Sequence, residues 1–246
     1  MTNKYMYFVA NWKMYGNLSS LNALDKVIRF SKSKEIRGGR LIYCPPNTLI
    51  SSFSKKFRNC QIGIGAQNCH ENKDYGAHTG FVNSRMLKNI GAHFVIIGHS
   101  ENRKIGESDK LINLKIKSAL EAKLKVIFCI GETLSEKRKK KTKSILSKQI
   151  KYGLKNIKDK SNIFLAYEPV WAIGSGIIPK SKDLFNTVEF IKSKFKDKSP
   201  KILYGGSVNP KNIRNLKEIN NIDGYLIGGA SQNAKKFIDI VKKTYS

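Results

Sequence analysis

The chain has 246 residues, of which 40% are hydrophobic, and it carries a formal net charge of +28 at pH 7. This length suits one or two ordinary domains or a single α/β barrel, and no apolar run reaches the roughly 18 residues of a transmembrane helix. The first residues lack a secretory signal pattern, and the Cys and His residues lack C-x-x-C and zinc spacings, so we expect a cytoplasmic protein with no metal site and no membrane partner.

Eight short apolar runs are predicted to be strands. They are continuous rather than alternating, as expected where both faces of a parallel sheet are covered, and each ends in glycine, polar or charged residues. In chain order they cover residues 7–12, 41–44, 62–68, 94–100, 125–132, 163–169, 202–207 and 225–230.

Segments with helical spacing separate these runs. Apolar or small residues recur at intervals of three or four in Leu21/Leu24/Ile28, Leu49/Phe53/Phe57, Leu111/Leu114/Ser118, Leu184/Val188/Ile191/Phe195 and Phe237/Ile238/Val241. Ser108 is expected to cap one of these helices, with Asp109 at its positive end, and Pro210 is expected to begin another.

Eight strand–helix alternations leave no room for a second domain, and no Pro/Gly/Ser linker interrupts them. The pairs Gly63–Gly65 and Gly174–Gly176 do not continue into G-x-G-x-x-G, which disfavours an open dinucleotide-binding sheet. The sequence therefore predicts the α/β class, as a single-domain (β/α)8 barrel over residues 1–246. In such barrels the chemistry lies at the C-terminal ends of the strands.

Polar side chains follow several of these predicted strand ends. Asn11 and Lys13 follow the first run, His99 and Glu101 come at the end of the fourth, and Glu168 ends the sixth. A lone lysine is usually a solvated surface residue, and a histidine at a strand end can simply be hydrogen-bonded there. A carboxylate that ends an apolar strand is costly to desolvate unless it is paired or functional, so Glu168 is the strongest candidate.

Glycines follow the last two predicted strands, in GGS at 205–207 and GGAS at 228–231. They let backbone N–H groups approach a ligand closely, and a short helix beginning there would favour an anion. Either segment alone could be an ordinary tight turn. Two of them after consecutive strands match the phosphate site that is frequent in barrels.

The sequence resembles the triosephosphate isomerase family over essentially its whole length. The resemblance rests on ANWKMYG (10–16), GAQNC (65–69), IIGHSE (96–101), GESD (106–109), CIGETL (129–134), AYEPVWAIGSG (166–176), YGGSV (204–208) and DGYLIGGAS (223–231).

The resemblance implies a TIM barrel that interconverts dihydroxyacetone phosphate and D-glyceraldehyde 3-phosphate through an enediolate, in glycolysis and gluconeogenesis, without a cofactor or metal. By the same resemblance Glu168 would be the general base and His99 a neutral imidazole that polarises the carbonyl. Lys13 and Asn11 would stabilise negative charge, with Glu101 supporting Lys13. The phosphate would bind Asn11, Lys13, Gly174, Ser207, Gly228 and Gly229. The lid would consist of Pro169, Val170, Trp171, Ala172, Ile173, Gly174, Ser175 and Gly176.

The segment after the lid departs from the family pattern. Ile177, Ile178 and Pro179 stand where many relatives have a Lys-Thr-Ala-Thr-like run. This is the C-terminal hinge, so the opening kinetics are expected to differ while the chemistry stays the same.

The interface pattern also departs from the family. Phe81 and Asn102 replace a glutamate and an arginine that can pair across the dimer interface of relatives. Because both charges are missing together, neither is left buried without a partner. The resemblance therefore still implies a homodimer, in which the loop around Thr79 (about 69–83) inserts near Lys13 of the partner.

Two alternatives stay open beside this interpretation. One is a barrel that acts on a different sugar phosphate, which the lid segment and GHSE (98–101) argue against. The other is a basic protein that binds nucleic acid. The 38 lysines outnumber the 8 arginines, they are dispersed apart from KRKKK (137–141), and no RNA-binding motif accompanies them. Compositional drift is therefore favoured, and no specific nucleic-acid partner is expected.

Overall fold

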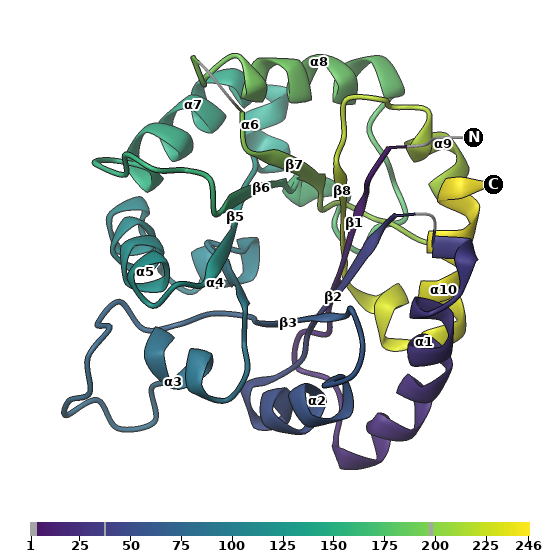
Figure 1. The fold of residues 1–246 in the computed structure, drawn as a ribbon. Coiled ribbons are helices and arrows are strands. Elements are labelled where there is room, and N and C mark those ends of the chain that lie inside the picture. Colours follow the sequence, from purple (N-terminus) through teal and green to yellow (C-terminus); the bar gives the residue numbers. More distant parts are fainter. Residues whose placement is uncertain (1–3, 37, 197–198) are drawn as a thin grey trace.

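Eight parallel strands form a closed barrel in the computed structural model, and each strand pairs with the next along the chain until β8 closes on β1 (Figure 1). The structure describes residues 4–36, 38–196 and 199–246. The strands are β1 (Tyr7–Asn11), β2 (Arg40–Cys44), β3 (Gly63–Ala66), β4 (Phe94–Ile97), β5 (Lys125–Ile130), β6 (Ile163–Tyr167), β7 (Lys201–Tyr204) and β8 (Gly224–Ile227). The predicted (β/α)8 barrel is confirmed.

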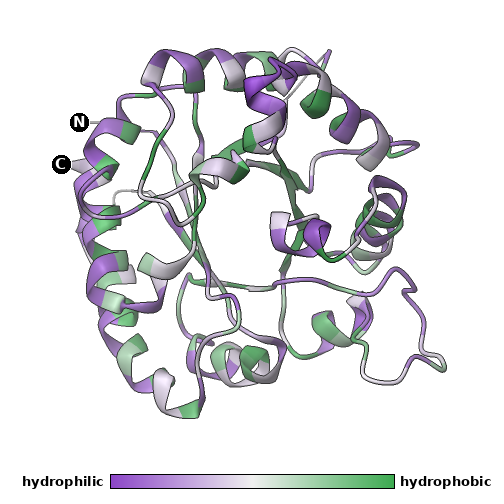
Figure 2. Cartoon of the chain, turned by 180° about the vertical axis from the view of Figure 1, so that it is seen from behind, coloured by the Kyte–Doolittle hydropathy of each residue, from purple (hydrophilic) through white to green (hydrophobic). Residues whose placement is uncertain are grey.

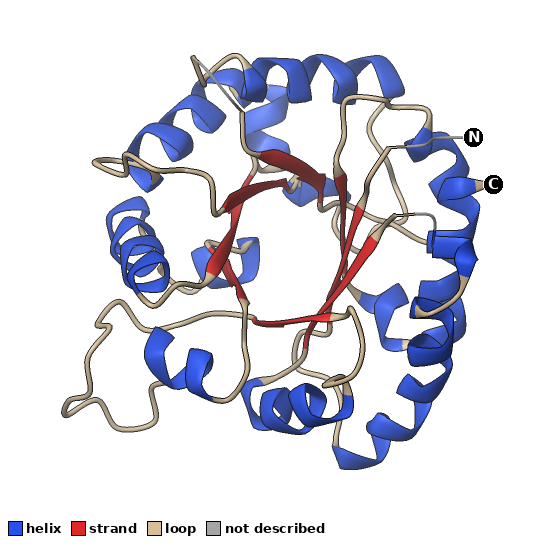
Figure 3. Cartoon of the chain, viewed as in Figure 1, coloured by secondary structure: helices blue, strands red, loops and turns tan. Residues whose placement is uncertain are grey.

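Helices surround the barrel on the outside (Figure 3). The α-helices are α1 (Leu24–Ser31), α2 (Ile50–Lys56), α3 (Ser84–Asn89), α4 (Ser100–Lys104), α5 (Asp109–Glu121), α6 (Leu134–Arg138), α7 (Thr142–Gly153), α8 (Ser181–Lys192), α9 (Ile213–Lys217) and α10 (Ala234–Tyr245). Short 3₁₀ helices are η1 (Leu18–Ala23), η2 (Lys34–Ile36), η3 (Asn47–Leu49), η4 (Val170–Ala172) and η5 (Gly229–Gln232). No helix in the described part of the chain is long and apolar enough to cross a membrane.

The core has two layers, one on each face of the barrel sheet. The inner layer fills the barrel with buried side chains that include Val9, Ile96 and Leu203. The outer layer packs the opposite strand faces against the helices, and Phe8, Ile97 and Val188 belong to it. Figure 2 shows the strands mostly in the green of hydrophobic residues, whereas the helices alternate between green and purple. Both faces of each strand are therefore apolar, which explains the continuous apolar runs in the sequence.

Seven of the eight strands end one to three residues before the predicted apolar run ends. In β6, for example, the predicted run reaches residue 169, but the ladder ends at Tyr167. Several of the residues left over at these ends, including His99, Glu168 and Ser207, line the cavity in the mouth of the barrel. The predicted runs therefore extend past the hydrogen-bonded strands.

Helix α5 presents a different face from the predicted one. Ser108 caps the helix as expected, because its side chain accepts a hydrogen bond from the Leu111 N–H. However, Leu114 is exposed, and the helix instead buries Ile112 and Ile116. Of the predicted face, Ser118 is buried, whereas Leu111 is half-buried and Leu114 is exposed.

Helix α9 begins three residues later than predicted. Pro210 lies in a turn, and the helix starts at Ile213. The Asn209 side chain accepts hydrogen bonds from the N–H groups of Lys211 and Asn212, at 2.9 and 3.1 Å. The N–H groups of Lys211 and Asn212 are thus bonded to the Asn209 side chain. Residues 210–212 form a turn, and the helix begins only at Ile213.

Candidate active site

The C-terminal ends of the strands meet at one mouth of the barrel, and the predicted site residues gather there. A cavity of about 200 Å³ lies in this mouth. The lining residues are Asn11, Lys13, His99, Glu168, Ile173, Gly174, Gly205, Gly206, Ser207, Val208, Asn209, Leu226, Gly228, Gly229 and Ala230. Five strand ends and the predicted lid therefore contribute to one pocket.

Glu168 follows β6 directly, and its side chain is almost completely buried, with 2% of the residue exposed. One carboxylate oxygen, Oε2, accepts a hydrogen bond from the Ser100 N–H at 3.3 Å. The other, Oε1, lies 3.1 Å from His99 Nε2 but is not aligned with it as a hydrogen bond, and it has no hydrogen-bond partner among the described residues. Burial raises the pKa of Glu168, outweighing His99 and the Ser100 N–H, which lower it. Glu168 is thus a stronger base than a free carboxylate.

The position of His99 at the start of α4 determines which of its nitrogens carries the proton. Its Nδ1 accepts a hydrogen bond from the Glu101 N–H at 3.2 Å. Because a backbone N–H can only donate, this bond assigns the ring as a neutral imidazole with its proton on Nε2. That Nε2–H group lines the cavity on the side of Glu168. His99 is therefore placed as a neutral hydrogen-bond donor.

Lys13 is a cation held by a constrained backbone. Its φ angle of 56° is unusual for a residue other than glycine. Its N–H donates to Asn11 Oδ1 at 3.1 Å, and Gln67 Nε2 donates both to the Lys13 carbonyl and to the Cys44 carbonyl at 2.9 Å. The ammonium group lies 2.6 Å from Glu101 Oε1. The backbone bonds therefore aim the charged end of Lys13 at the mouth of the barrel.

Glu101 responds to this cation. Partial burial acts to raise the pKa of Glu101, but the hydrogen bond from Lys13 and the neighbouring positive charges outweigh it, and the net pKa lies below the usual value. Glu101 therefore stays ionised beside Lys13, as expected for a supporting residue, and it lies in an adjacent cavity rather than in the one that contains Glu168.

Two glycines lie close to the side chains of the site. A Cβ atom on Gly205 would come within 2.8 Å of Glu168 Cγ, so a side chain there would collide with the base. A Cβ atom on Gly228 would be 3.4 Å from Lys13 Cε, at the point where η5 begins. Ser207 and Gly229 complete this wall of the cavity. The predicted phosphate-binding segments thus face the predicted cation.

The lid is attached at its beginning and exposed at its tip. Trp171 Nε1 donates to Glu132 Oε1 at 2.9 Å, and the Lys137 ammonium lies 3.3 Å from the centre of a Trp171 ring. Gly174 and Gly176 are exposed, and their φ angles of 69° and 77° are left-handed. The lid therefore borders the cavity with its tip in solvent. Beyond it Pro179 is buried, which gives the altered hinge a fixed end.

Sequence reasoning missed Glu132 and Gln67. Glu132 is 1% exposed, and burial raises its pKa more than the hydrogen bonds from Trp171 and Tyr167 lower it. The signal was available, because Glu132 ends the fifth apolar run in the same way that Glu168 ends the sixth. Gln67 carried a weaker signal, since an uncharged side chain just past a strand costs little to leave exposed.

A buried base, a neutral imidazole donor, a held cation and a glycine-lined wall suit proton removal next to the carbonyl of a phosphorylated substrate. The class that fold and site define is a (β/α)8-barrel enzyme that performs acid–base chemistry on a phosphorylated substrate.

Comparisons with known proteins identify the family. The family model for triosephosphate isomerase matches residues 6–244. A triosephosphate isomerase of Thermodesulfovibrio yellowstonii is 42% identical over 245 residues, covering 96% of this chain and 98% of that protein. One of Bradyrhizobium diazoefficiens is 40% identical and covers 94% of each. The crystal structure of triosephosphate isomerase from Bartonella henselae superposes with a TM-score of 0.88 at 35% identity, covering 98% of this chain and 99% of that one.

The chain belongs to the triosephosphate isomerase family. Its activity is the isomerisation of triose phosphates, which interconverts dihydroxyacetone phosphate and D-glyceraldehyde 3-phosphate.

Proposed function

We propose that this isomerisation proceeds by proton transfer through Glu168 at the mouth of the barrel. Glu168 removes a proton from C1 of dihydroxyacetone phosphate and returns it to C2. The electron pair of the C1–H bond forms the C1–C2 double bond, and the carbonyl oxygen becomes negative. The observation that carries the proposal is the buried Glu168 carboxylate, whose Oε1 lacks a hydrogen-bond partner among the described residues and lies beside His99 Nε2.

The remaining site residues act on the developing negative charge. Between these two steps His99 passes the proton of the C1 hydroxyl to the negative oxygen on C2, so that the C1 oxygen becomes the aldehyde carbonyl when the proton returns to C2. Asn11 and Lys13 stabilise the negative charge meanwhile. Donors of this kind are effective because they are held in place before the reaction begins. Glu101 orients Lys13 through the 2.6 Å contact.

The phosphate group lies against the glycine-lined wall. Ser207, Gly228 and Gly229 line the cavity beside Lys13, and Gly174 approaches from the lid. An enediolate phosphate can lose its phosphate in water, so closure of residues 169–176 over the substrate protects the intermediate. Trp171, which donates to Glu132 Oε1 at 2.9 Å, holds the first part of this segment.

A coupled assay tests this reaction directly. Dihydroxyacetone phosphate is supplied alone, and a glyceraldehyde-3-phosphate dehydrogenase reports the product as NADH. We expect rapid NADH formation that depends on the protein. No signal, or faster turnover of a larger sugar phosphate in a matched assay, would contradict the proposed substrate.

We propose that the chain is a homodimer formed through the loop around Thr79. Figure 1 shows the segment between β3 and α3 projecting from the barrel. Large apolar side chains are exposed there and beside the site, including Tyr75 at 72%, Phe81 at 64% and Met14 at 94%. These exposed apolar side chains, two on the loop and one beside the site, support an interaction surface here.

A recess next to the active site fits the same loop of a partner. This second cavity measures about 270 Å³, and Lys13, Gln67 and Asn102 are among its lining residues. A partner loop inserted there would cover the side of Lys13 that faces away from Glu168. Asn102 stands where relatives have an arginine. This position therefore adds no unpaired charge to the recess.

Light scattering at micromolar concentration tests the dimer. The wild type is expected to have twice the mass of one chain, and Phe81→Glu is expected to shift it toward the monomer because it places a charge in the apolar contact. Tyr152→Glu, at a partly exposed aromatic residue on α7, should leave the dimer intact. A monomeric wild type would contradict the dimer.

We further propose that residues 1–246 act as one domain in the cytoplasm and need no cofactor. The pairing of β1 with β8 supports the single domain, because both ends of the chain contribute to one closed sheet. The interconversion places the enzyme in glycolysis and gluconeogenesis.

A further inference from the structure

We infer that the opposite mouth of the barrel carries a binding groove for single-stranded nucleic acid. A hollow of about 790 Å³ lies between α7 and the segments that lead into β5, β6 and β7. Its lining combines seven lysines, one carboxylate and an apolar floor. The lysines are Lys125, Lys151, Lys158, Lys160, Lys194, Lys196 and Lys201.

The hollow is separate from the active site. Lys125, Ile163 and Lys201 are the first residues of β5, β6 and β7, whereas Glu168 follows the other end of β6. A strand of five residues spans roughly 16 Å, so the barrel wall separates the two places. Changes in the hollow can therefore be tested without touching the catalytic residues.

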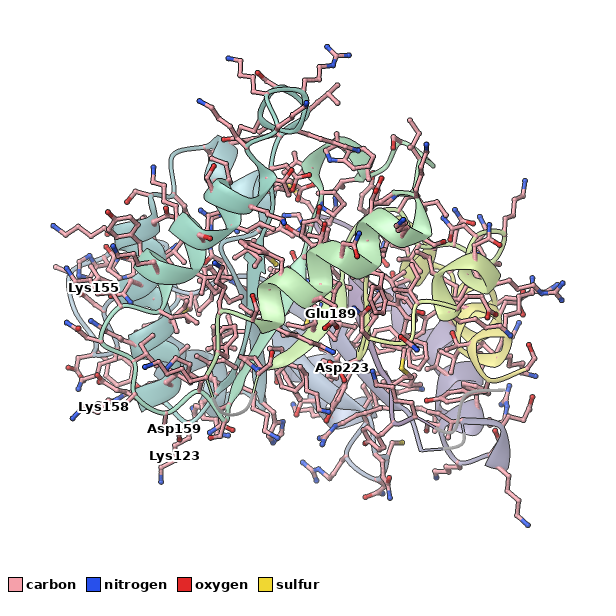
Figure 4. All side chains as sticks on the ribbon, turned by 90° about the horizontal axis from the view of Figure 1, so that it is seen from above. Lys123, Lys155, Lys158, Asp159, Glu189 and Asp223 are labelled. Atoms are coloured by element: carbon pink, nitrogen blue, oxygen red, sulfur yellow. The ribbon has the colours of Figure 1, made fainter. Side chains whose placement is uncertain are left out.

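The lysines of the hollow are largely without carboxylate partners. Within the ranges that the structure describes, Lys201 alone among the seven forms an ion pair, at 3.4 Å from Asp223. Asp159 is the single carboxylate among the described residues of the lining, and the N–H and hydroxyl groups of Ser161 bind its two oxygens at 2.8 and 3.0 Å. Figure 4 places Lys158 and Asp159 together at one edge of the molecule. The hollow thus has a concentrated positive charge.

Compositional drift explains lysines on every face, and most described lysines outside the hollow also lack a carboxylate within ion-pair distance. The hollow differs in that seven lysines line one recess in which one described carboxylate lies. Like charges brought together without counter-charges repel one another, and a bound polyanion relieves that repulsion.

The floor of the hollow distinguishes among possible polyanions. Two aromatic residues of the lining, Tyr7 and Phe195, are half-buried, whereas Phe164, Leu154 and Ile163 are buried. Tyr7 and Phe164 pack edge to face at 4.9 Å. Single strands of nucleic acid combine closely spaced phosphates with planar bases that stack on aromatic rings. Inorganic polyphosphate offers nothing to the apolar floor, and a flat bilayer cannot enter a hollow. Single-stranded nucleic acid therefore matches both parts of the lining, without sequence preference.

Fluorescence anisotropy with a labelled 15-nucleotide oligouridylate tests the groove. One variant combines Lys158→Glu, Lys194→Glu and Lys196→Glu. The matched control combines Lys26→Glu, Lys211→Glu and Lys235→Glu, at exposed positions outside the hollow, and changes the net charge equally. We expect the wild type to bind. Each lysine that neutralises a phosphate makes the slope of log affinity against log salt steeper by about 0.7. Losing three such lysines should therefore make that slope shallower by about 2 in the groove variant.

At 50 mM salt we expect the groove variant to lose at least about tenfold more affinity than the control variant. Isomerase activity should be unchanged in both, which shows that both are folded. Equal losses in the two variants would overturn the groove in favour of diffuse surface charge. Equally tight binding of inorganic polyphosphate or of an abasic oligomer of the same length would overturn the assignment to nucleic acid, because the apolar floor would then contribute nothing.

Discussion

Glu168→Gln is expected to lower kcat by about 10²–10⁴-fold in the coupled isomerase assay, because the amide cannot accept the substrate proton. The replacement keeps the size and shape of the side chain, and its carbonyl oxygen can still accept the Ser100 N–H bond that Glu168 accepts at 3.3 Å. Glu35→Gln is the matched control, since Glu35 is exposed and pairs only with Lys242 among the described residues. The control should keep wild-type activity. A Glu168→Gln enzyme with wild-type kcat would remove Glu168 from the mechanism.

The stability of the same variant distinguishes lost chemistry from lost folding. Burial raises the folded-state pKa of Glu168 above its unfolded value, so the ionised carboxylate destabilises the folded protein at pH values above the folded pKa. Glu168→Gln removes this penalty. Its free energy of unfolding at pH 8 should therefore exceed that of the wild type, and the difference should vanish as the pH falls below the unfolded pKa of about 4.3.

Lys115→Met is expected to lower the free energy of unfolding by about 3–5 kcal/mol, because it leaves Glu107 buried without its cation. Lys115 and Glu107 form an ion pair whose side chains are 9% and 8% exposed. Asn68 completes the cluster, since its Nδ2 donates to Glu107 Oε1 at 2.8 Å and its Oδ1 accepts from Lys115 at 3.2 Å. Urea unfolding at pH 7 measures the loss.

Two further variants show whether the unpaired charge is the cause. Combining Lys115→Met with Glu107→Leu should recover most of the lost stability, since joint replacement of a buried pair is often nearly neutral. Lys73→Met, which breaks the exposed pair with Glu121, should cost about 1 kcal/mol or less. If Lys115→Met costs no more than Lys73→Met, the buried pair does not contribute as argued.

The barrel itself could be predicted because its strands are covered on both faces. Such strands read as continuous apolar runs, and eight of them alternating with helical spacing fit one closed sheet. The burial of Glu168 at a strand end could be predicted for the same reason, and a carboxylate that ends an apolar run conflicts with its surroundings unless it is paired or functional. Glu132 gave the same signal without being recognised.

Some features could not be predicted because tertiary contacts decide them. In α5, Leu111 and Leu114 compete with Ile112 and Ile116 for the buried face, and packing selects the isoleucines. The burial of Lys115 could not be predicted from the neighbouring sequence either, because it depends on Glu107, eight residues away. The left-handed backbone of Lys13 depends on Gln67, which is distant in the sequence.

The central claim is that Glu168 carries the substrate proton between C1 and C2. The most direct measurement follows the conversion of dihydroxyacetone phosphate in D2O by ¹H NMR. A proton held on a carboxylate exchanges with solvent, so the wild type should form glyceraldehyde 3-phosphate with deuterium at C2 in part of the product, and Glu168→Gln should lose this incorporation together with turnover. Product that forms at the full rate without any deuterium would mean that the hydrogen moves from C1 to C2 without exchanging, as in a direct hydride shift, and it would contradict the account.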